Sequence, residues 1–201
     1  AFEPAFADEL TAMMRWSFDH LQADDGGSVY LRLTTRNIAQ VPRENADWEA
    51  QALAGAYWLR TPAPGASAAI VYCGAIAPEA IAAWEMLADD LPGLGLLAVT
   101  SPDLLHRGWS AARASRWGRG AHTQSHIETL LADLAPGAGL VTVIDGSPAA
   151  LSWLGGVRGQ RVSPLGVDRF GQTGTLADLY RVYRLDADSI VEAMAELLLP
   201  L

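Results

Sequence analysis

Apolar residues recur with two different periods along this chain, and the period predicts the local structure. Near the start, Phe6, Leu10, Met14 and Phe18 recur at every fourth residue, which predicts a helix with one apolar stripe. Between residues 28 and 34, apolar and polar residues alternate, as in a strand with one apolar face. One helix and one strand are too few to bury their own apolar faces. We therefore expect this unit to pack against a sheet formed by other residues.

Short apolar runs alternate with helical patterns from residue 56 onwards. Strands are predicted at residues 56–60, 68–73, 94–100, 140–144 and 162–167. A Pro/Gly turn joins the first two, which predicts an antiparallel pair at the sheet edge. The others alternate with helices, which is typical of parallel strands joined by crossovers. We therefore expect an α/β fold of three layers: a mostly parallel sheet of about five strands with one antiparallel edge strand, preceded by a partial α/β domain.

The most specific stretch runs from Pro164 to Ala195, where an apolar strand ends in a glycine-punctuated loop that leads into two helices. Pro164 predicts an edge strand or a bulge. A loop at the carboxyl end of such a strand lies where parallel sheets place ligands or partners. The loop residues of interest are Asp168, Phe170, Gly171 and Gln172. The acid could orient a ligand, but an aromatic side chain between glycines favours an interface with a partner.

Composition excludes several classes of function. The 201 residues are 50% hydrophobic, and no apolar run approaches the length of about 20 residues that crosses a bilayer. We therefore expect a soluble, cytoplasmic protein without a membrane association. The formal charge is -9 and every cation is an arginine, which makes nucleic acid a poor partner. The lone cysteine, Cys73, ends an apolar strand and is predicted to be a small core residue.

Sequence motifs for common active sites are missing. No lysine is present for a phosphate-binding P-loop, and no G-x-S-x-G segment marks a nucleophilic serine. His122 and His126 are four residues apart, so a helix would place them at metal-ligand distance. Without an H-E-x-x-H pattern, surface or capping roles are favoured. We expect no catalytic residue and no metal site in this chain.

Arg36 is the candidate substrate-binding residue. It follows the alternating run that ends at Thr34, and an arginine just past a strand can hold a carboxylate or phosphate through two parallel hydrogen bonds. An arginine that pairs with a neighbouring acid at a domain junction is the alternative. The residues alone leave both roles open.

Three stretches, taken together and in order, resemble one enzyme family. The first comprises Phe2–Leu10 and Gly27–Thr35, the second Gly55–Arg60 and Ala69–Gly74, and the third Leu165–Gly171 and Leu185–Asp188. They resemble the C-terminal part of the homodimeric, thiamine-dependent decarboxylating component of pyruvate dehydrogenase and of transketolase. The resemblance implies three parts: the end of a pyrimidine-binding domain (1–44), a linker and entry strand (45–60), and a transketolase-type C-terminal domain (61–201).

Oxidative decarboxylation of a 2-oxo acid is the activity that this resemblance implies. In the family, thiamine diphosphate and Mg²⁺ act together, and the acyl unit passes to a lipoyl-bearing acyltransferase component. The diphosphate-binding G-D-G segment with its asparagine, and the glutamate that activates the cofactor, are not found in this chain. We expect them in upstream residues of a longer, homodimeric protein. By itself the chain should have a structural and dimerisation role, bind no cofactor and be inactive.

Two alternatives remain. Leu33-Thr-Thr-Arg36-Asn-Ile-Ala-Gln40 is similar to the transketolase segment whose arginine contacts a sugar phosphate. This similarity implies that role for Arg36, and with it a transketolase acting on sugar phosphates. The other alternative is a stand-alone α/β domain that binds a partner or oligomerises.

Overall fold

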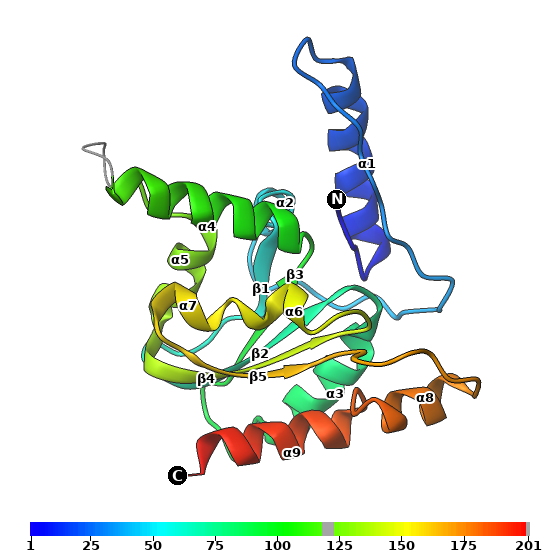
Figure 1. The fold of residues 1–201 in the computed structure, drawn as a ribbon, viewed down its shortest axis with the longest axis vertical. Coiled ribbons are helices and arrows are strands. Elements are labelled where there is room, and N and C mark those ends of the chain that lie inside the picture. The colour runs from blue at the N-terminus through cyan, green and yellow to red at the C-terminus, as the bar shows by residue number, and fades with distance from the viewer. Residues whose placement is uncertain (118–122, 200–201) are drawn as a thin grey trace.

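A five-stranded sheet forms the centre of the computed structural model, which describes residues 1–117 and 123–199 (Figure 1). The strand order is β1-β3-β2-β4-β5. β2, β3, β4 and β5 are parallel, and β1 pairs antiparallel with β3 at one edge. The strands are β1 (Ala56–Arg60), β2 (Ala66–Cys73), β3 (Gly95–Val99), β4 (Leu134–Ile144) and β5 (Arg161–Leu165). The predicted fold class is confirmed, and Pro164 lies in an edge strand as expected.

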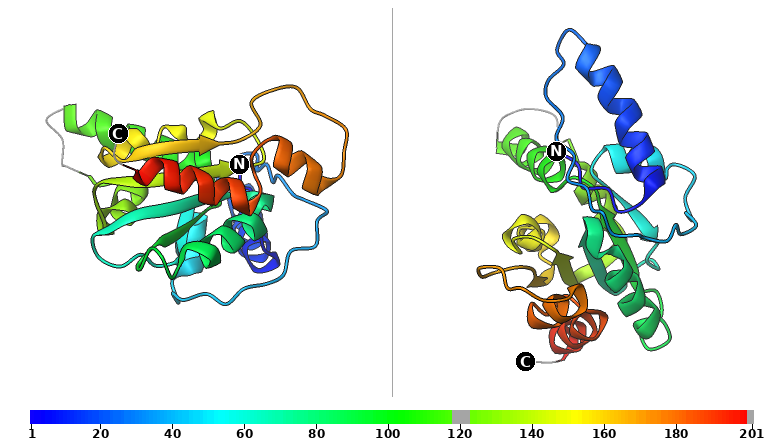
Figure 2. Two further views of the ribbon diagram at one scale, coloured as in Figure 1. Left: turned by 90° about the horizontal axis from the view of Figure 1, so that it is seen from below. Right: turned by 90° about the vertical axis from the view of Figure 1, so that its right-hand side faces the viewer.

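Helices cover both faces of this sheet, which gives three layers (Figures 1 and 2). One face carries α3 (Ala77–Leu87), α8 (Leu176–Val182) and α9 (Ala187–Leu198). The other face carries α4 (Pro102–Trp117), α5 (His126–Leu130), α6 (Ala149–Ser152) and α7 (Gly155–Arg158). Two short 3₁₀ turns, Gly74–Ile76 and Leu131–Asp133, complete the connections. No helix in the described ranges combines the length and apolar character that crossing a membrane requires.

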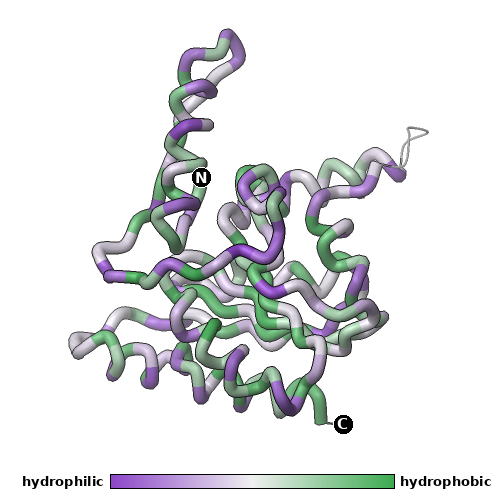
Figure 3. The backbone as a smooth tube through the Cα atoms, turned by 180° about the vertical axis from the view of Figure 1, so that it is seen from behind, coloured by the Kyte–Doolittle hydropathy of each residue, from purple (hydrophilic) through white to green (hydrophobic). Residues whose placement is uncertain are grey.

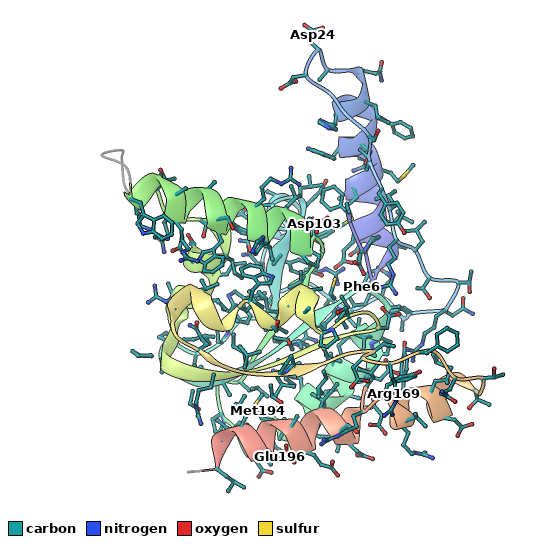
Figure 4. The ribbon with its side chains drawn as sticks, in the orientation of Figure 1. Phe6, Asp24, Asp103, Arg169, Met194 and Glu196 are labelled. Carbon is teal, nitrogen blue, oxygen red and sulfur yellow. The ribbon has the colours of Figure 1, made fainter. Side chains whose placement is uncertain are left out.

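Strand alternation divides the interior into two cores. In β2, Ile70 and Tyr72 face α3 and α9, whereas Val71 and Cys73 face α4 to α7. Hydrophobic residues are concentrated along these central strands (Figure 3). On α9, Met194 is fully buried against the sheet, while Glu196 lies on the outer side (Figure 4). Both faces are therefore buried, as continuous apolar runs predict for parallel strands.

The N-terminal helix projects away from this body. α1 (Ala7–Gln22) has Phe6 at its base against the sheet and Asp24 just past its far end (Figure 4). The predicted helix is confirmed, and its buried residues extend from Glu9 to Ser17. Met13 is fully buried, whereas the exposed fractions of Phe18 and Leu21 are 56% and 55%. A second short helix, α2 (Trp48–Leu53), packs beside β1.

The strand predicted at residues 28–34 is not formed. The segment contains a single isolated bridge, between Leu31 and Phe2. Two hydrogen bonds make this bridge, from Phe2 N–H to the Tyr30 carbonyl and from Arg32 N–H to the Phe2 carbonyl, both 2.9 Å. The described residues offer no further strand beside it, so the alternating pattern has no ladder to join.

The predicted pairing of the first two strands is wrong. β3 lies between β1 and β2 and pairs with both. The turn between β1 and β2 is tied to other segments: Ala63 N–H donates to the Gly93 carbonyl at 3.1 Å and Gly65 N–H to the Asp133 carbonyl at 2.7 Å. The turn therefore bonds to the segments before β3 and β4. Because β3 lies between β1 and β2, these two strands do not form a hairpin.

Two consecutive glycines, Gly155 and Gly156, begin α7. They are needed for close packing. A Cβ atom at Gly156 would lie 3.3 Å from the Trp109 ring, and one at Gly155 would lie 3.1 Å from the Gln160 carbonyl oxygen. The glycine that follows the end of α7 is Gly159, whose φ of 78° lies in the left-handed region.

Replacing Gly166, directly after β5, should destabilise the fold. A Cβ atom there would lie 2.7 Å from the Gly146 carbonyl oxygen and from the ring of Pro148. We expect Gly166→Ala to lower the free energy of unfolding by about 1–3 kcal/mol, measured by urea denaturation. Gly171→Ala is the matched control, because nothing lies within 4 Å of a Cβ at that position. Equal effects of both changes would contradict this packing argument.

Candidate functional site at the carboxyl edge of the sheet

The carboxyl ends of β2 and β4 flank the place where ligands bind in many parallel sheets. After β2 the chain turns to α3 on one face, and after β4 it turns to α6 on the other. Neighbouring strands whose connections leave on opposite faces leave a crevice between their ends. Gly74 and Ala75 follow β2 at this point, and Asp145 and Gly146 follow β4.

Arg32 fills this crevice from the N-terminal segment. Its Nη1 lies 2.7 Å from Asp145 Oδ1 and 2.8 Å from Glu3 Oε2, and its Nη2 donates to the Asp145 backbone carbonyl at 3.0 Å. Burial works to lower the pKa of Arg32, but its hydrogen bonds with Glu3 and Asp145 outweigh burial and raise it. One guanidinium thus bridges two carboxylates that would otherwise repel each other.

The first three residues lie along the ends of the neighbouring strands. Glu3 N–H donates to the carbonyl of Thr100, which follows β3, at 2.7 Å. Ser101 Oγ donates to the Ala1 carbonyl at 2.6 Å. These contacts occupy the backbone groups that a ligand would otherwise use at the end of β3.

Arg36 lies beside the same edge and forms a two-pronged ion pair with Glu79 of α3. The two nitrogen-to-oxygen distances are 2.9 and 2.7 Å. The guanidinium also lies 5.6 Å from the centre of the Tyr180 ring. Hydrogen bonding to Glu79 raises the pKa of Arg36. The structure therefore shows the pairing with a neighbouring acid, while contact with a substrate stays a prediction.

The remaining space at the crevice is small. A cleft of about 90 Å³ is lined by Glu3, Arg32, Gly74, Asp145 and neighbouring residues, whereas pockets for drug-sized ligands measure about 300–1,000 Å³. Asp145-Gly146 does not fit a diphosphate site, because the aspartate is already paired with Arg32. In the described parts of the chain, no three His, Cys, Asp or Glu side chains are placed to share a metal ion. These residues do not fit thiamine diphosphate with its Mg²⁺.

A second contact joins α1 to the antiparallel edge of the sheet. Glu9 is 1% exposed and accepts a hydrogen bond from Tyr57 Oη of β1 at 2.6 Å. Its other oxygen accepts from the backbone N–H groups of Ala5 and Phe6, at 2.6 and 3.1 Å. Burial raises the pKa of Glu9, although these hydrogen bonds oppose the shift.

Arg43 reinforces this second contact from the segment between the N-terminal unit and α2. Its side chain is 7% exposed and lies 2.6 Å from Asp8 Oδ1. The guanidinium also lies over three aromatic rings: those of Phe6 at 4.5 Å, Trp48 at 4.9 Å and Tyr57 at 5.5 Å. Such contacts are favourable between a cation and an aromatic face. The N-terminal segment, the linker and β1 are therefore held together.

Comparison with known proteins agrees with this architecture. No protein-family model matches the sequence. The chain is 30% identical to the pyruvate dehydrogenase E1 component of Mycolicibacterium smegmatis over 206 aligned residues, which cover 97% of this chain and 22% of that protein. The chain thus spans about a fifth of the length of this curated relative.

Transketolases are among the solved structures with the same fold. A transketolase variant from Pichia stipitis in complex with fructose 6-phosphate matches with a TM-score of 0.68 and 19% identity, over 98% of this chain and 24% of that one. A split-gene transketolase, described as an inactive beta4 tetramer, matches with a TM-score of 0.68 and 21% identity, over 98% of this chain and 56% of that one. The chain has a transketolase-type fold and is related to a pyruvate dehydrogenase E1 component. The resemblance seen in the sequence is confirmed.

The loop from Asp168 to Gln172 lies at the carboxyl end of β5 in this transketolase-type fold, where the sequence predicts it. Phe170 is 93% exposed, and its backbone carbonyl accepts a hydrogen bond from Tyr183 Oη at 3.0 Å. Asp168, Gly171 and Gln172 are also exposed. No hydrogen bond or ion pair within the described residues joins this loop to Arg36. Its role as an interface stays a prediction.

The other residues singled out in the sequence have structural surroundings. His126 begins α5, and its Nε2 lies 2.7 Å from the Ala56 carbonyl oxygen. His122 lies outside the described residues. Cys73 is fully buried, and burial raises the pKa of its thiol, so the predicted core role is confirmed.

Sequence reasoning missed Arg32 and Glu9, which make the two principal contacts. Arg32 was assigned only to the polar face of an alternating run. Glu9 offered a faint signal: it lies three residues after Phe6, among the apolar residues that face the body. There its carboxylate receives the N–H groups at the helix start, as in a capping box.

Replacing Glu9 should destabilise the junction. Glu9→Ala leaves two backbone N–H groups and the Tyr57 hydroxyl buried without an acceptor, so we expect the free energy of unfolding to fall by at least about 2 kcal/mol. Glu9→Gln keeps an acceptor oxygen and should cost clearly less. Urea denaturation followed by tryptophan fluorescence measures both, and equal losses would contradict the role given to the carbonyl-type oxygen.

The pH dependence of stability in the parent and in the Glu9→Gln variant tests the burial of this carboxyl group. Because the pKa of Glu9 is raised on folding, its contribution to stability is present below the unfolded pKa and is lost as the pH rises through the folded value. The Gln variant lacks this loss. Relative to the parent, the Glu9→Gln variant should therefore gain stability as the pH rises above the ordinary pKa of a glutamate, about 4.3.

Proposed function

We propose that this chain is the C-terminal part of a thiamine diphosphate-dependent 2-oxo acid dehydrogenase of the pyruvate type. The observation that carries the proposal is the 30% identity to a pyruvate dehydrogenase E1 component, which extends over 97% of the chain. In this role the chain supports the enzyme and its homodimer, and the chemistry belongs to residues outside it. The complete enzyme would work in the cytoplasm and pass its acyl unit to a lipoyl-bearing acyltransferase.

The crevice at the carboxyl ends of β2 and β4 is filled, which favours a structural role for this chain over a catalytic one. Arg32 and residues 1–3 occupy the place where a parallel sheet would receive a ligand. Thiamine diphosphate and Mg²⁺ would be held by other residues of the complete enzyme, where the cofactor would provide the carbanion chemistry of decarboxylation.

The N-terminal unit is the part that we propose to be incomplete. Its exposed apolar side chains are Phe18, Leu21, Tyr30 and Leu33, all more than half exposed. Residues 1–44 would be the end of a pyrimidine-binding domain whose remaining strands cover these side chains. Residues 45–60 would form the linker and entry strand, and residues 61–201 the C-terminal domain.

Activity measurements test the proposal. With thiamine diphosphate, Mg²⁺ and pyruvate, the 201-residue chain should show no release of carbon dioxide, whereas the complete gene product should release it and reduce ferricyanide. Turnover by the 201-residue chain would contradict the proposal. A complete gene product that uses xylulose 5-phosphate but not pyruvate would favour the transketolase alternative. A gene product that corresponds to this chain alone, without a cofactor-binding partner chain, would favour a separate binding or oligomerisation domain.

A transketolase is the second candidate, because the segment around Arg36 is similar to the transketolase segment whose arginine contacts a sugar phosphate. In the complete enzyme, Arg36→Ala should raise the KM for the substrate, by about ten-fold or more if a two-pronged contact to a phosphate is lost. Glu79→Gln is the matched control, since it disrupts the ion pair but leaves the guanidinium in place. An unchanged KM in Arg36→Ala, with a similar loss of thermal stability in both variants, would assign Arg36 to structure only.

A further inference from the structure

A groove lined by arginines and tryptophans lies along the C-terminal half of α4, beside α7. It consists of two adjoining hollows of about 340 and 310 Å³ that share Arg116 and Glu128. Its other principal side chains are Trp109, Arg113, Trp117 and Arg158. We call it the Arg/Trp groove. It lies on the face of the sheet opposite α3 and α9, and neither contact of the N-terminal unit uses it.

Arg113 lines one of the two hollows and has no acidic partner among the described residues. Its guanidinium carbon lies 4.7 Å from the centre of the Trp109 ring and 5.4 Å from that of Trp117. No hydrogen bond or ion pair connects its side chain to any other residue that the structure describes. Stacking orients the planar guanidinium and leaves its N–H groups available to an anion.

Glu128, the carboxylate among the described lining residues, is already paired with an arginine. Glu128 is 8% exposed and lies 2.6 Å from Arg116 Nη2. Burial works to raise the pKa of Glu128, but hydrogen bonds from Ser125 and the contact with Arg116 outweigh burial and lower it. Glu128 is therefore already paired, and within the described parts of the chain no hydrogen bond or ion pair joins the guanidinium of Arg113 or Arg158 to an acid. This local cluster of arginines contrasts with the net charge of -9 of the chain.

Exposed aromatic surface accompanies these charges. Trp117 is 82% exposed, whereas Trp109, eight residues earlier on α4, is 7% exposed and stacks on Trp153 at 5.2 Å. The groove therefore combines a buried tryptophan with an exposed one that offers a large apolar surface. Tryptophan and arginine are the residue types most enriched where binding energy concentrates in protein interfaces.

We propose that the Arg/Trp groove docks a short acidic segment of a partner protein. Asp or Glu side chains of that segment pair with Arg113 and Arg158, and one apolar side chain packs against Trp117. A short segment is favoured over nucleic acid, because the strongly negative chain repels a long polyanion while a local patch still attracts a few carboxylates.

Selection of peptides tests this proposal. A phage library of random peptides of about 12 residues is selected on the 201-residue chain, and the affinities of the selected peptides are measured by fluorescence anisotropy. The selected sequences should share at least two acidic residues and one large apolar residue. Arg113→Glu should weaken their binding by about ten-fold or more, and Trp117→Ala should also weaken it. Arg158→Glu is a second charge variant in case Arg113→Glu does not fold.

The matched control is Arg181→Glu on α8, at the opposite face of the sheet, which changes the net charge by the same amount. It should leave the affinity within about two-fold. Circular dichroism and thermal unfolding verify that each variant folds. The proposal is overturned if no peptide binds, if the selected peptides lack acidic residues, or if Arg113→Glu and Arg181→Glu weaken binding equally. Tighter binding of a single-stranded oligothymidine would assign the groove to nucleic acid instead.

Discussion

Asp145 stands where β4 ends, beside the ends of two further parallel strands, and its carboxylate needs a cation there. Arg32 provides it, together with a hydrogen bond to the Asp145 backbone and an ion pair to Glu3. Because Arg32 and Glu3 come from the N-terminal segment, this one guanidinium attaches that segment to the sheet. Together with the contact between Glu9 and Tyr57, it holds the base of α1 to the body, and it fills the crevice between β2 and β4.

The crevice between the carboxyl ends of β2 and β4 is filled in this fold. A parallel sheet whose connections leave on opposite faces usually keeps the crevice open for a ligand. Here, side chains and backbone of the same chain take that place, with Arg36 and Glu79 paired at its border. The curated relative and the transketolase from Pichia stipitis are each about four times longer than this chain or more.

Arginines that lie over aromatic rings occur on both faces of the sheet, but they differ in whether an acid pairs with them. On one face, Arg36 and Arg43 are paired with acids of the same chain and lie over aromatic rings. On the other, Arg113 lies over tryptophan rings but has no acid within the described residues. The same stacking geometry thus stabilises an internal contact in one place and leaves a binding surface in the other.

Local pattern predicted the elements of this protein, and tertiary contacts decided what they form. The period of the apolar residues located five strands and the helix of residues 7–22, and Pro164 marked an edge strand, because these features depend on neighbours in sequence. Which strand pairs with β1 could not be predicted, since β3 lies between β1 and β2 but follows β1 by more than thirty residues in the sequence.

The candidate site could be predicted only in part. Arg36 was found from its place after an alternating run, but its acid lies 43 residues further on, and Arg32 and Asp145 are separated by 113 residues. Folding alone brings such charges together, so only the tertiary structure decided that the crevice between β2 and β4 is filled by residues of the same chain.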